Sequence, residues 1–139
     1  MFEKLKKFLE DDEECFVIGG IDETRIDEIE RSLEIVFPQI YESFLNKFGL
    51  LIGYGIDILG CGKGAEASVV RETKRYRSLG LPDNFIVIQN VDEWVYCLDS
   101  TTGEVVSWDR DDKQFKLICN NFEEYLCSIL LEAKKNWDA

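Results

Sequence analysis

The sequence predicts an α+β protein in which a single antiparallel sheet of about four to six strands is flanked by N-terminal helices, a middle helix and a C-terminal helix. Three observations support this class. Residues 2–48 carry apolar residues at helical spacing, residues 85–108 carry short apolar runs separated by turn residues, and helical spacing returns after residue 121. Helices followed by strands and then by another helix are typical of α+β proteins. A chain of 139 residues, 45% of them hydrophobic, is expected to form one domain over residues 1–139.

The first two predicted helices differ in how clearly they are delimited. Residues 2–10 predict a short helix, and 15–18 predict either a short strand or an extended apolar anchor. Asp22 then suits the N-cap of the next helix, and Ile21 and Ile26 are placed to contact each other across that cap. The buried stripe of this helix is expected to continue to Val36.

Two amphipathic helices are predicted to meet at Pro38. Phe37 precedes the proline and is therefore pushed out of the α region. Pro38 suits the first residue of the second helix, where its missing N–H costs nothing. Apolar residues then recur at helical spacing through Phe48, and Gly49 provides a left-handed stop. We interpret the aromatic face of this helix as core.

The middle of the chain predicts a strand over 56–59, a glycine loop over 60–65 and a helix over about 65–79. The loop Gly60–Ala65 loosely matches a phosphate-binding pattern, but Gly64 stands where a Walker loop needs Ser or Thr. The strands that follow are hairpins, so the parallel series of a dinucleotide-binding fold is also missing. The loop is therefore either a surface connection or a nucleotide site, and the pattern favours the connection.

The second half of the chain predicts three strands and a helix. The strands cover 85–90, 94–98 and 104–108, and their hairpin-length connections make them antiparallel. Asn121 suits the N-cap of the last helix, and Glu124 would complete a capping box. The buried stripe of this helix is expected to run from Phe122 to Trp137.

Composition argues against an enzyme. The chain has no histidine, which excludes Ser-His-Asp and Cys-His nucleophile systems and histidine-containing zinc sites. Its five cysteines form no CxxC pair and are expected to be reduced. The run that starts at Asp109 resembles a calcium loop, but Gln114 and Asn120 occupy the positions that need Gly and Glu. We expect no catalysis, no metal and no cofactor.

The formal net charge of −12 constrains the partner. Such a field repels nucleic acid and anionic membranes and speeds the encounter with a basic protein, although acidity also serves solubility alone. The chain has no apolar stretch long enough for a membrane span or a signal peptide. We therefore expect a cytoplasmic protein.

The candidate binding residues are aromatic and acidic groups at strands, strand ends and turns. Aromatic anchors surrounded by carboxylates suit a surface rich in Arg and Lys. The alternative for Trp94 and Trp108 is that they belong to the core under the helices. The candidate set is Asp57, Asp92, Glu93, Trp94, Asp99, Trp108, Asp109, Asp111 and Asp112.

The helix–proline–helix corner and the later strands resemble the SUKH superfamily, whose name comes from fungal regulators of cell-wall synthesis. The corner supplies Phe37-Pro38, Tyr41, Phe44-Leu45 and Phe48-Gly49 in order, and the strands supply 58–60, 96–99 and 106–109. Phe37 stands where the family usually has leucine, and Lys47-Phe48-Gly49 departs from its usual Asn-Gly ending.

This resemblance implies an α+β fold and, for bacterial members, an immunity function. The protein would bind and block a cognate toxin domain that is basic and of the nuclease class, and it would act as a monomer or weak dimer. The resemblance carries over no catalytic residue. The alternative that it suggests is a regulatory protein-interaction scaffold related to the cell-wall-synthesis regulators.

Overall fold

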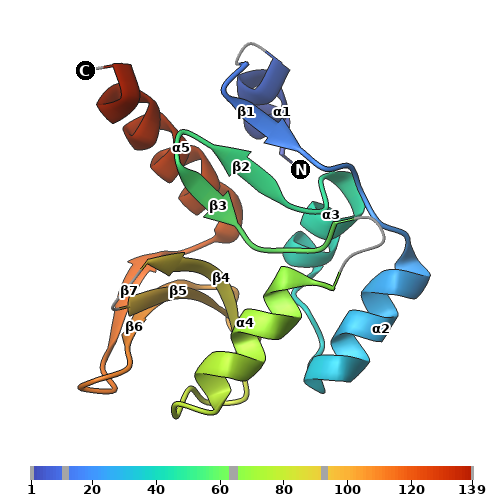
Figure 1. The fold of residues 1–139 in the computed structure, drawn as a ribbon, viewed down its shortest axis with the longest axis vertical. Helices are drawn as coiled ribbons and strands as arrows, with labels where there is room; N and C mark the ends of the chain where they lie inside the picture. Colours follow the sequence, from blue (N-terminus) through green and yellow to red (C-terminus); the bar gives the residue numbers. More distant parts are fainter. Residues whose placement is uncertain (1, 11–12, 63–65, 92–93, 139) are drawn as a thin grey trace.

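The computed structural model describes residues 2–10, 13–62, 66–91 and 94–138. This part of the chain forms five helices and seven strands (Figure 1). In chain order they are α1 (Glu3–Glu10), β1 (Cys15–Val17), α2 (Glu23–Leu33), α3 (Gln39–Lys47), β2 (Leu51–Gly53), β3 (Ile56–Ile58), α4 (Ser68–Arg77), β4 (Phe85–Val91), β5 (Trp94–Asp99), β6 (Val105–Asp109), β7 (Phe115–Cys119) and α5 (Phe122–Asp138).

The α+β class is confirmed, but the strands of the described chain form two antiparallel sheets where one was expected. β1, β2 and β3 form a three-stranded sheet, and β4 to β7 form a four-stranded meander. The chain leaves the first sheet through α4 before β4 begins, so β4 starts a new sheet. A backbone hydrogen bond from Leu59 N to Ile88 O, at 2.9 Å, links the segment after β3 to β4.

Two strands were missing from the sequence prediction, and both lack the usual pattern. β2 spans three residues, which is too short to show an alternation of apolar and polar side chains. β7 is exposed along nearly its whole length and follows the acidic turn that resembles a calcium loop. β2 pairs with β1 and β3, and β7 pairs with β6. These neighbouring strands, and not a local sequence pattern, hold β2 and β7 in the extended conformation.

The predicted cap of α2 is confirmed, and the predicted length of its buried stripe is wrong. Asp22 accepts a hydrogen bond from the Arg25 backbone N–H at 2.9 Å. The helix ends at Leu33, because Glu34 adopts a left-handed conformation with φ of 53°. Val36 therefore lies beyond the helix and is exposed.

The corner at Pro38 is confirmed and forms the aromatic centre of the molecule. Pro38 is the N-cap of α3, so the helix begins at Gln39, one residue later than expected, and Gly49 has the predicted positive φ, 76°. The rings of Tyr41 and Phe44 both contact Phe122 of α5, with centroids 5.5 and 5.3 Å apart respectively. The Tyr41 hydroxyl also donates to the Leu59 carbonyl at 2.8 Å.

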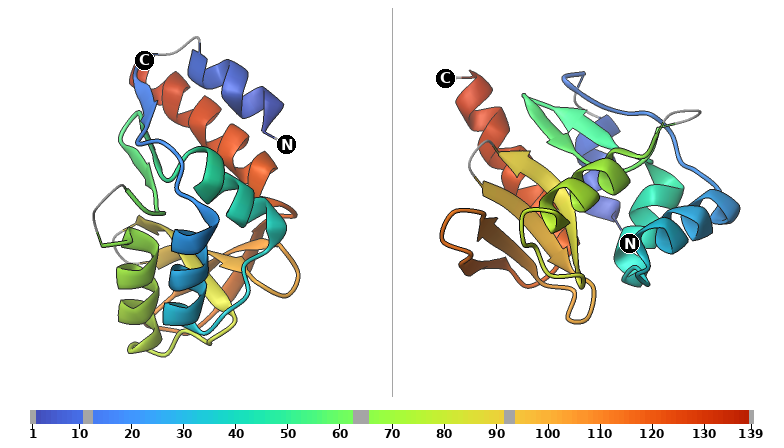
Figure 2. Two further views of the ribbon diagram at one scale, coloured as in Figure 1. Left: turned by 90° about the vertical axis from the view of Figure 1, so that its right-hand side faces the viewer. Right: turned by 60° about the horizontal axis from the view of Figure 1, so that its bottom comes forward.

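The two faces of the four-stranded sheet are covered differently. α4 packs on one face, where Tyr76 meets Trp108 edge to face at 6.4 Å. The first turns of α5 pack on the other face, where Tyr125 contacts Tyr96 at 5.7 Å. The rest of α5 runs away from the four-stranded sheet toward β2 and β3 (Figures 1 and 2). A large part of this second face is therefore left uncovered.

The start of the glycine loop has a structural explanation. Gly60 lies so close to the backbone of α3's end that a Cβ there would overlap the Gly49 carbonyl oxygen. The Gly60 N–H and carbonyl also contact the Ser68 hydroxyl, at 3.1 and 3.2 Å. Residues 63–65 of the predicted nucleotide loop lie outside the described residues.

Gly60→Ala is expected to reduce the free energy of unfolding by about 3 kcal/mol or more, because the collision involves backbone that must shift. Gly55→Ala is the matched control. Gly55 has a positive φ of 80° but open space around it, so only about 1 kcal/mol of backbone strain is expected. Urea denaturation of both variants measures the difference. Equal losses of unfolding free energy in the two variants would show that the close approach of the Gly49 backbone is not the reason for a glycine at position 60.

Candidate functional site

The uncovered part of the four-stranded sheet presents side chains from neighbouring strands as one surface, which we call the open sheet face. Trp94 pairs with Val91 and with Asp109, and Tyr96 pairs with Ser107. Residues between them, such as Val95, are buried on the opposite face because side chains alternate along a strand. The open sheet face consists of Val91, Trp94, Tyr96, Ser107, Asp109 and Lys116.

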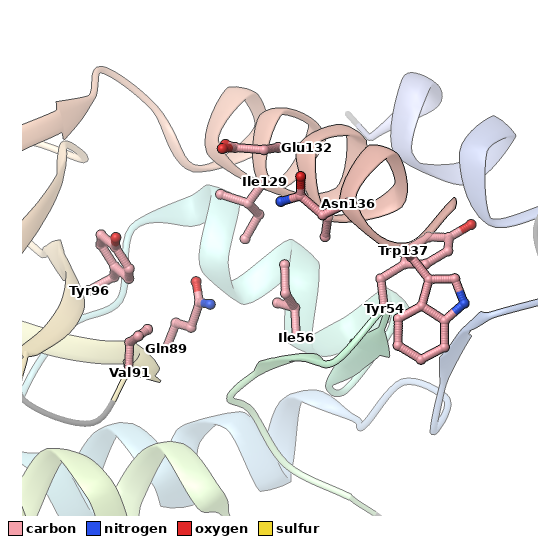
Figure 3. Close-up of a pocket in the computed structure, with 10 residues that line it drawn as sticks. Tyr54, Ile56, Gln89, Val91, Tyr96, Ile129, Glu132, Asn136 and Trp137 are labelled. Atoms are coloured by element: carbon pink, nitrogen blue, oxygen red, sulfur yellow. The ribbon is translucent and has the colours of Figure 1, made fainter. Parts of the chain in front are cut away.

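Two hollows meet on this surface. One has a volume of about 370 Å³ and lies over β5, β6 and β7. Trp94 and Asp112 are among the residues that line it. The other, of about 420 Å³, lies between α5, the β2–β3 hairpin and the edge of β4 (Figure 3). Tyr96 lines both hollows, so they adjoin on the surface.

The second hollow is bounded by aromatic rings and by amide and carboxylate groups. Tyr54 and Trp137 meet edge to face at 6.0 Å at one end, while Gln89 and Tyr96 lie at the other (Figure 3). The Tyr125 hydroxyl donates a hydrogen bond to the Gln89 side-chain carbonyl, which fixes the orientation of that amide. The hollow therefore has a rigid floor and an exposed aromatic rim.

The carboxylates beside the open sheet face are held by the β6–β7 turn. Asp109 accepts the Asp111 backbone N–H at 2.8 Å, and Asp112 accepts the Gln114 backbone N–H at 2.9 Å. These hydrogen bonds restrict the side chains before any partner arrives. Together with Glu132 of α5 they leave the surface acidic, since Lys116 is the basic group of the open sheet face.

The structure brings four of the predicted residues together. Trp94, Asp109 and Asp112 line one hollow, and Asp111 is exposed in the turn beside them. Trp94 is 39% exposed, so it is accessible to a partner. Asp92 and Glu93, which precede it, lie outside the described residues.

Trp108 belongs to the core, which was one of its two predicted alternatives. It is 1% exposed and packs against Tyr76 of α4 and Phe115 of β7. Its indole therefore cannot contact a partner in the folded protein. For Trp137 the prediction was wrong. It was expected on the buried stripe of the last helix, but it is exposed because α5 continues past the sheet.

Asp57 and Asp99 lie away from this surface. Asp57 belongs to β3 of the other sheet, where partial burial raises the pKa of its carboxyl and Arg71 opposes that shift. Asp99 lies at the opposite end of β5 from Trp94. Burial would raise the pKa of the Asp99 carboxyl, but hydrogen bonds from Thr101 (2.9 and 2.6 Å) and Asn84 (3.3 Å) lower it. Asp99 thus anchors a turn.

Several residues of the surface were not among the predicted site residues. Gln89, Glu132 and Asn136 carry no local pattern that marks them, because they meet only when β4 and α5 pack together. Tyr54 follows a strand too short to be recognised. The C-terminal end of α5 meets Tyr54 because the helix runs past the four-stranded sheet, which no local pattern of residues 122–138 indicates.

The titratable groups near the sheet do not resemble an activated nucleophile. Burial raises the pKa of the Cys97 thiol, which holds it protonated. Burial also raises the pKa of the Cys127 thiol, and Glu123 adds to the shift. Among the described residues, no group of three or more His, Cys, Asp or Glu side chains could hold a metal ion. All five cysteines are free thiols, as predicted.

None of the described helices combines the length and the apolar character that crossing a membrane requires.

The fold and its open sheet face define an α+β protein whose most prominent surface feature suits contact with another macromolecule. A family model described as SMI1-KNR4 cell-wall (SUKH_5) matches residues 1–131. The chain belongs to this family of the SUKH superfamily, which includes toxin-immunity proteins. The superfamily resemblance seen in the sequence is confirmed.

A solved structure shows the same fold. It is the crystal structure of a protein from Pseudomonas syringae pv. tomato, with a TM-score of 0.72. The similarity covers 94% of this chain and 98% of that one, at 18% sequence identity. At this identity the comparison supports the architecture alone.

Trp108→Ala is expected to reduce the free energy of unfolding by about 3–5 kcal/mol, because it empties a packed core site. Trp94→Ala is the matched comparison and should cost about 1 kcal/mol or less, since its ring is partly in water. Thermal and urea unfolding of the two variants measures the contrast. Similar losses would contradict the assignment of the two indoles to core and surface.

Asp99→Asn is expected to lower stability at neutral pH and to lose this effect in acid. A carboxyl whose pKa is lowered by folding stabilises the fold above its unfolded pKa of about 3.9, and this contribution disappears as pH falls through the folded pKa. Urea midpoints of wild type and variant should therefore begin to converge as the pH falls below about 4 and become equal below the folded pKa of Asp99. A constant difference across pH would show that the charge on Asp99 is not what stabilises its turn.

Proposed function

We propose that this protein is an immunity protein that binds and neutralises a cognate basic toxin domain of the nuclease class in the cytoplasm, as a monomer or weak dimer. The observation that carries the proposal is the open sheet face. There Trp94, 39% exposed, lies beside the preordered carboxylates of Asp109 and Asp112 in a protein of net charge −12. Membership of a family that includes toxin-immunity proteins supports it.

The chemistry of a nuclease matches this surface. A nuclease holds phosphates with Lys and Arg, so its substrate groove is basic. An acidic face that covers this groove excludes the nucleic acid by shape and by charge. Long-range attraction raises association rates, up to about 10⁸–10⁹ M⁻¹s⁻¹ at low salt.

Affinity requires more than charge. Protection from a lethal enzyme needs about nanomolar binding, which corresponds to about −12 kcal/mol. Exposed aromatic side chains that fill pockets on the partner are the common source of such energy. Trp94 and Trp137 are placed for this at two parts of the surface. The hydrogen-bonded carboxylates lose little freedom on binding, which reduces the cost of association.

The proposal is tested with the product of the neighbouring gene, which it predicts to carry a toxin domain. Expression of that domain alone should stop growth, and coexpression with this protein should restore it. The purified proteins should form a stoichiometric complex, and one equivalent of this protein should inhibit the nuclease. Full nuclease activity in the presence of excess protein would end the proposal.

Asp111→Lys is expected to slow association with the toxin domain by roughly severalfold at low salt and by less at high salt, because it reverses an exposed charge beside the open sheet face. Glu10→Lys is the control, since it makes the same charge change at an exposed site at the end of α1, outside the open sheet face. Stopped-flow kinetics at two salt concentrations compare them. Equal effects would mean that net charge matters and the location of the charge does not.

A second candidate function is a regulatory scaffold, which the cell-wall description of the matched family favours. A scaffold would bind several partners weakly through the same surface and would not inhibit an enzyme. Quantitative binding separates the two: a single nanomolar partner supports immunity, and several micromolar partners support the scaffold.

A further inference from the structure

The last strand of the four-stranded sheet is an exposed edge with apolar side chains. β7 ends the strand order and pairs with β6 as its one neighbouring strand in the described chain. Its residues Phe115, Leu117 and Ile118 are 41%, 54% and 40% exposed. An edge strand presents unpaired backbone donors and acceptors and is a template for another strand. Apolar side chains on such an edge increase this tendency.

The register identifies which backbone groups are available. The Asp109 N–H donates to the Gln114 carbonyl at 3.2 Å, so these two residues form a hydrogen-bonded pair. In an antiparallel ladder such pairs alternate with pairs that exchange no hydrogen bonds. Ser107 and Lys116 are therefore hydrogen bonded to each other. Phe115 and Leu117, which lie opposite Trp108 and Val106, direct their N–H and C=O groups away from β6.

Charge decides what kind of strand fits this edge. The turn before β7 carries Asp109, Asp111 and Asp112 against Arg110 and Lys113, and the first turn of α5 just after β7 carries Glu123 and Glu124, so both ends of the strand are net negative. In an antiparallel pair of two β7 strands, the acidic turn of one copy would lie against the acidic helix start of the other. Like charges in contact oppose such an interface. A basic strand from a different protein meets attraction at both ends.

We propose that β7 accepts an extended strand from a basic protein and so extends the four-stranded sheet by one strand. The hydrogen bonds come from the backbone of Phe115 and Leu117. The alternating side chains of the added strand would lie beside Lys116 and Ile118 on one face and beside Leu117 on the other. This inference rests on the proposed function in one respect, because it takes the basic protein to be the toxin domain and describes how that domain would be bound.

The probe is a short synthetic peptide of alternating lysine and valine, blocked at both ends. A second peptide of the same sequence, N-methylated at every residue, keeps the charge and loses the backbone N–H donors on both edges. The wild-type protein is expected to bind the first peptide at least about tenfold more tightly than the second. Binding should also slow hydrogen exchange of the Phe115 and Leu117 amides. Equal affinity for the two peptides, or no binding of the first, overturns the proposal.

Leu117→Pro tests the same edge from the side of the protein. It removes an N–H that points away from β6, so the hydrogen bonds within the sheet remain. Leu117→Thr is the matched control, because it removes the apolar side chain and keeps the N–H. The proline variant should lose about tenfold in peptide affinity and the threonine variant much less. Equal affinities for the peptide overturn the proposal; if the proline variant does not fold, the N-methylated peptide alone decides.

Two further outcomes separate this inference from the proposed function. A wild-type protein that forms a dimer broken by Leu117→Pro, in gel filtration, shows that the edge is used by a second copy and overturns the assignment of a basic partner. A toxin domain that is fully inhibited by the Leu117→Pro variant leaves the immunity function intact and overturns the strand pairing. Failure of the neighbouring toxin domain to bind at all removes the immunity function, while the peptide result still decides whether β7 accepts a strand.

Discussion

The contact between Tyr41 and Phe122 is the interaction on which the rest of the structure depends. Tyr41 stands on α3 just after the proline corner, and its ring meets Phe122, the first residue of α5, at 5.5 Å. Its hydroxyl donates to the Leu59 carbonyl, which lies between the two sheets. The side chains of Tyr41 and Phe122 are both fully buried. The buried Tyr41 hydroxyl has a hydrogen-bond acceptor, which avoids the large free-energy cost of an unsatisfied polar group. One side chain thus connects the N-terminal helices, the last helix and the segment that links the sheets.

The direction of α5 follows from this anchor and determines the open sheet face. Because Phe122 is held in the centre, the first turns of α5 cover only the part of the sheet around Tyr96, and the remaining turns leave the sheet (Figure 1). α4 covers the opposite face completely enough to bury Trp108. The molecule therefore has one well-packed sheet face and one that is available for contact, supported by a rigid core. A surface of this kind can bind a partner without rearranging, which keeps the cost of association low.

Acidity and aromatic exposure contribute to different parts of binding. The net charge of −12 acts over a distance of about 8–10 Å at physiological salt, so in the proposed complex it would guide the encounter with a basic partner. In the proposed complex, Trp94 and the apolar residues of β7 would act on contact, where buried area and backbone hydrogen bonds would hold the two proteins together. The carboxylates of the β6–β7 turn combine the two properties. They contribute to the negative charge, and their own turn holds them in place beside the edge strand. Under this proposal, the association rate and the lifetime of the complex depend on neighbouring but distinct residues.

The sequence by itself determined the local features of this protein. The cap at Asp22, the corner at Pro38, the stop at Gly49 and the hairpins of β4 to β6 depend on residues close together in the chain, so propensity and periodicity predict them. The tertiary structure alone decided the division into two sheets, the pairing of β2 and β7, and the separation of Trp108 in the core from Trp94 on the surface. These outcomes depend on which distant elements cover each strand, and both tryptophans look alike in a strand until α4 packs against one face and α5 leaves the other.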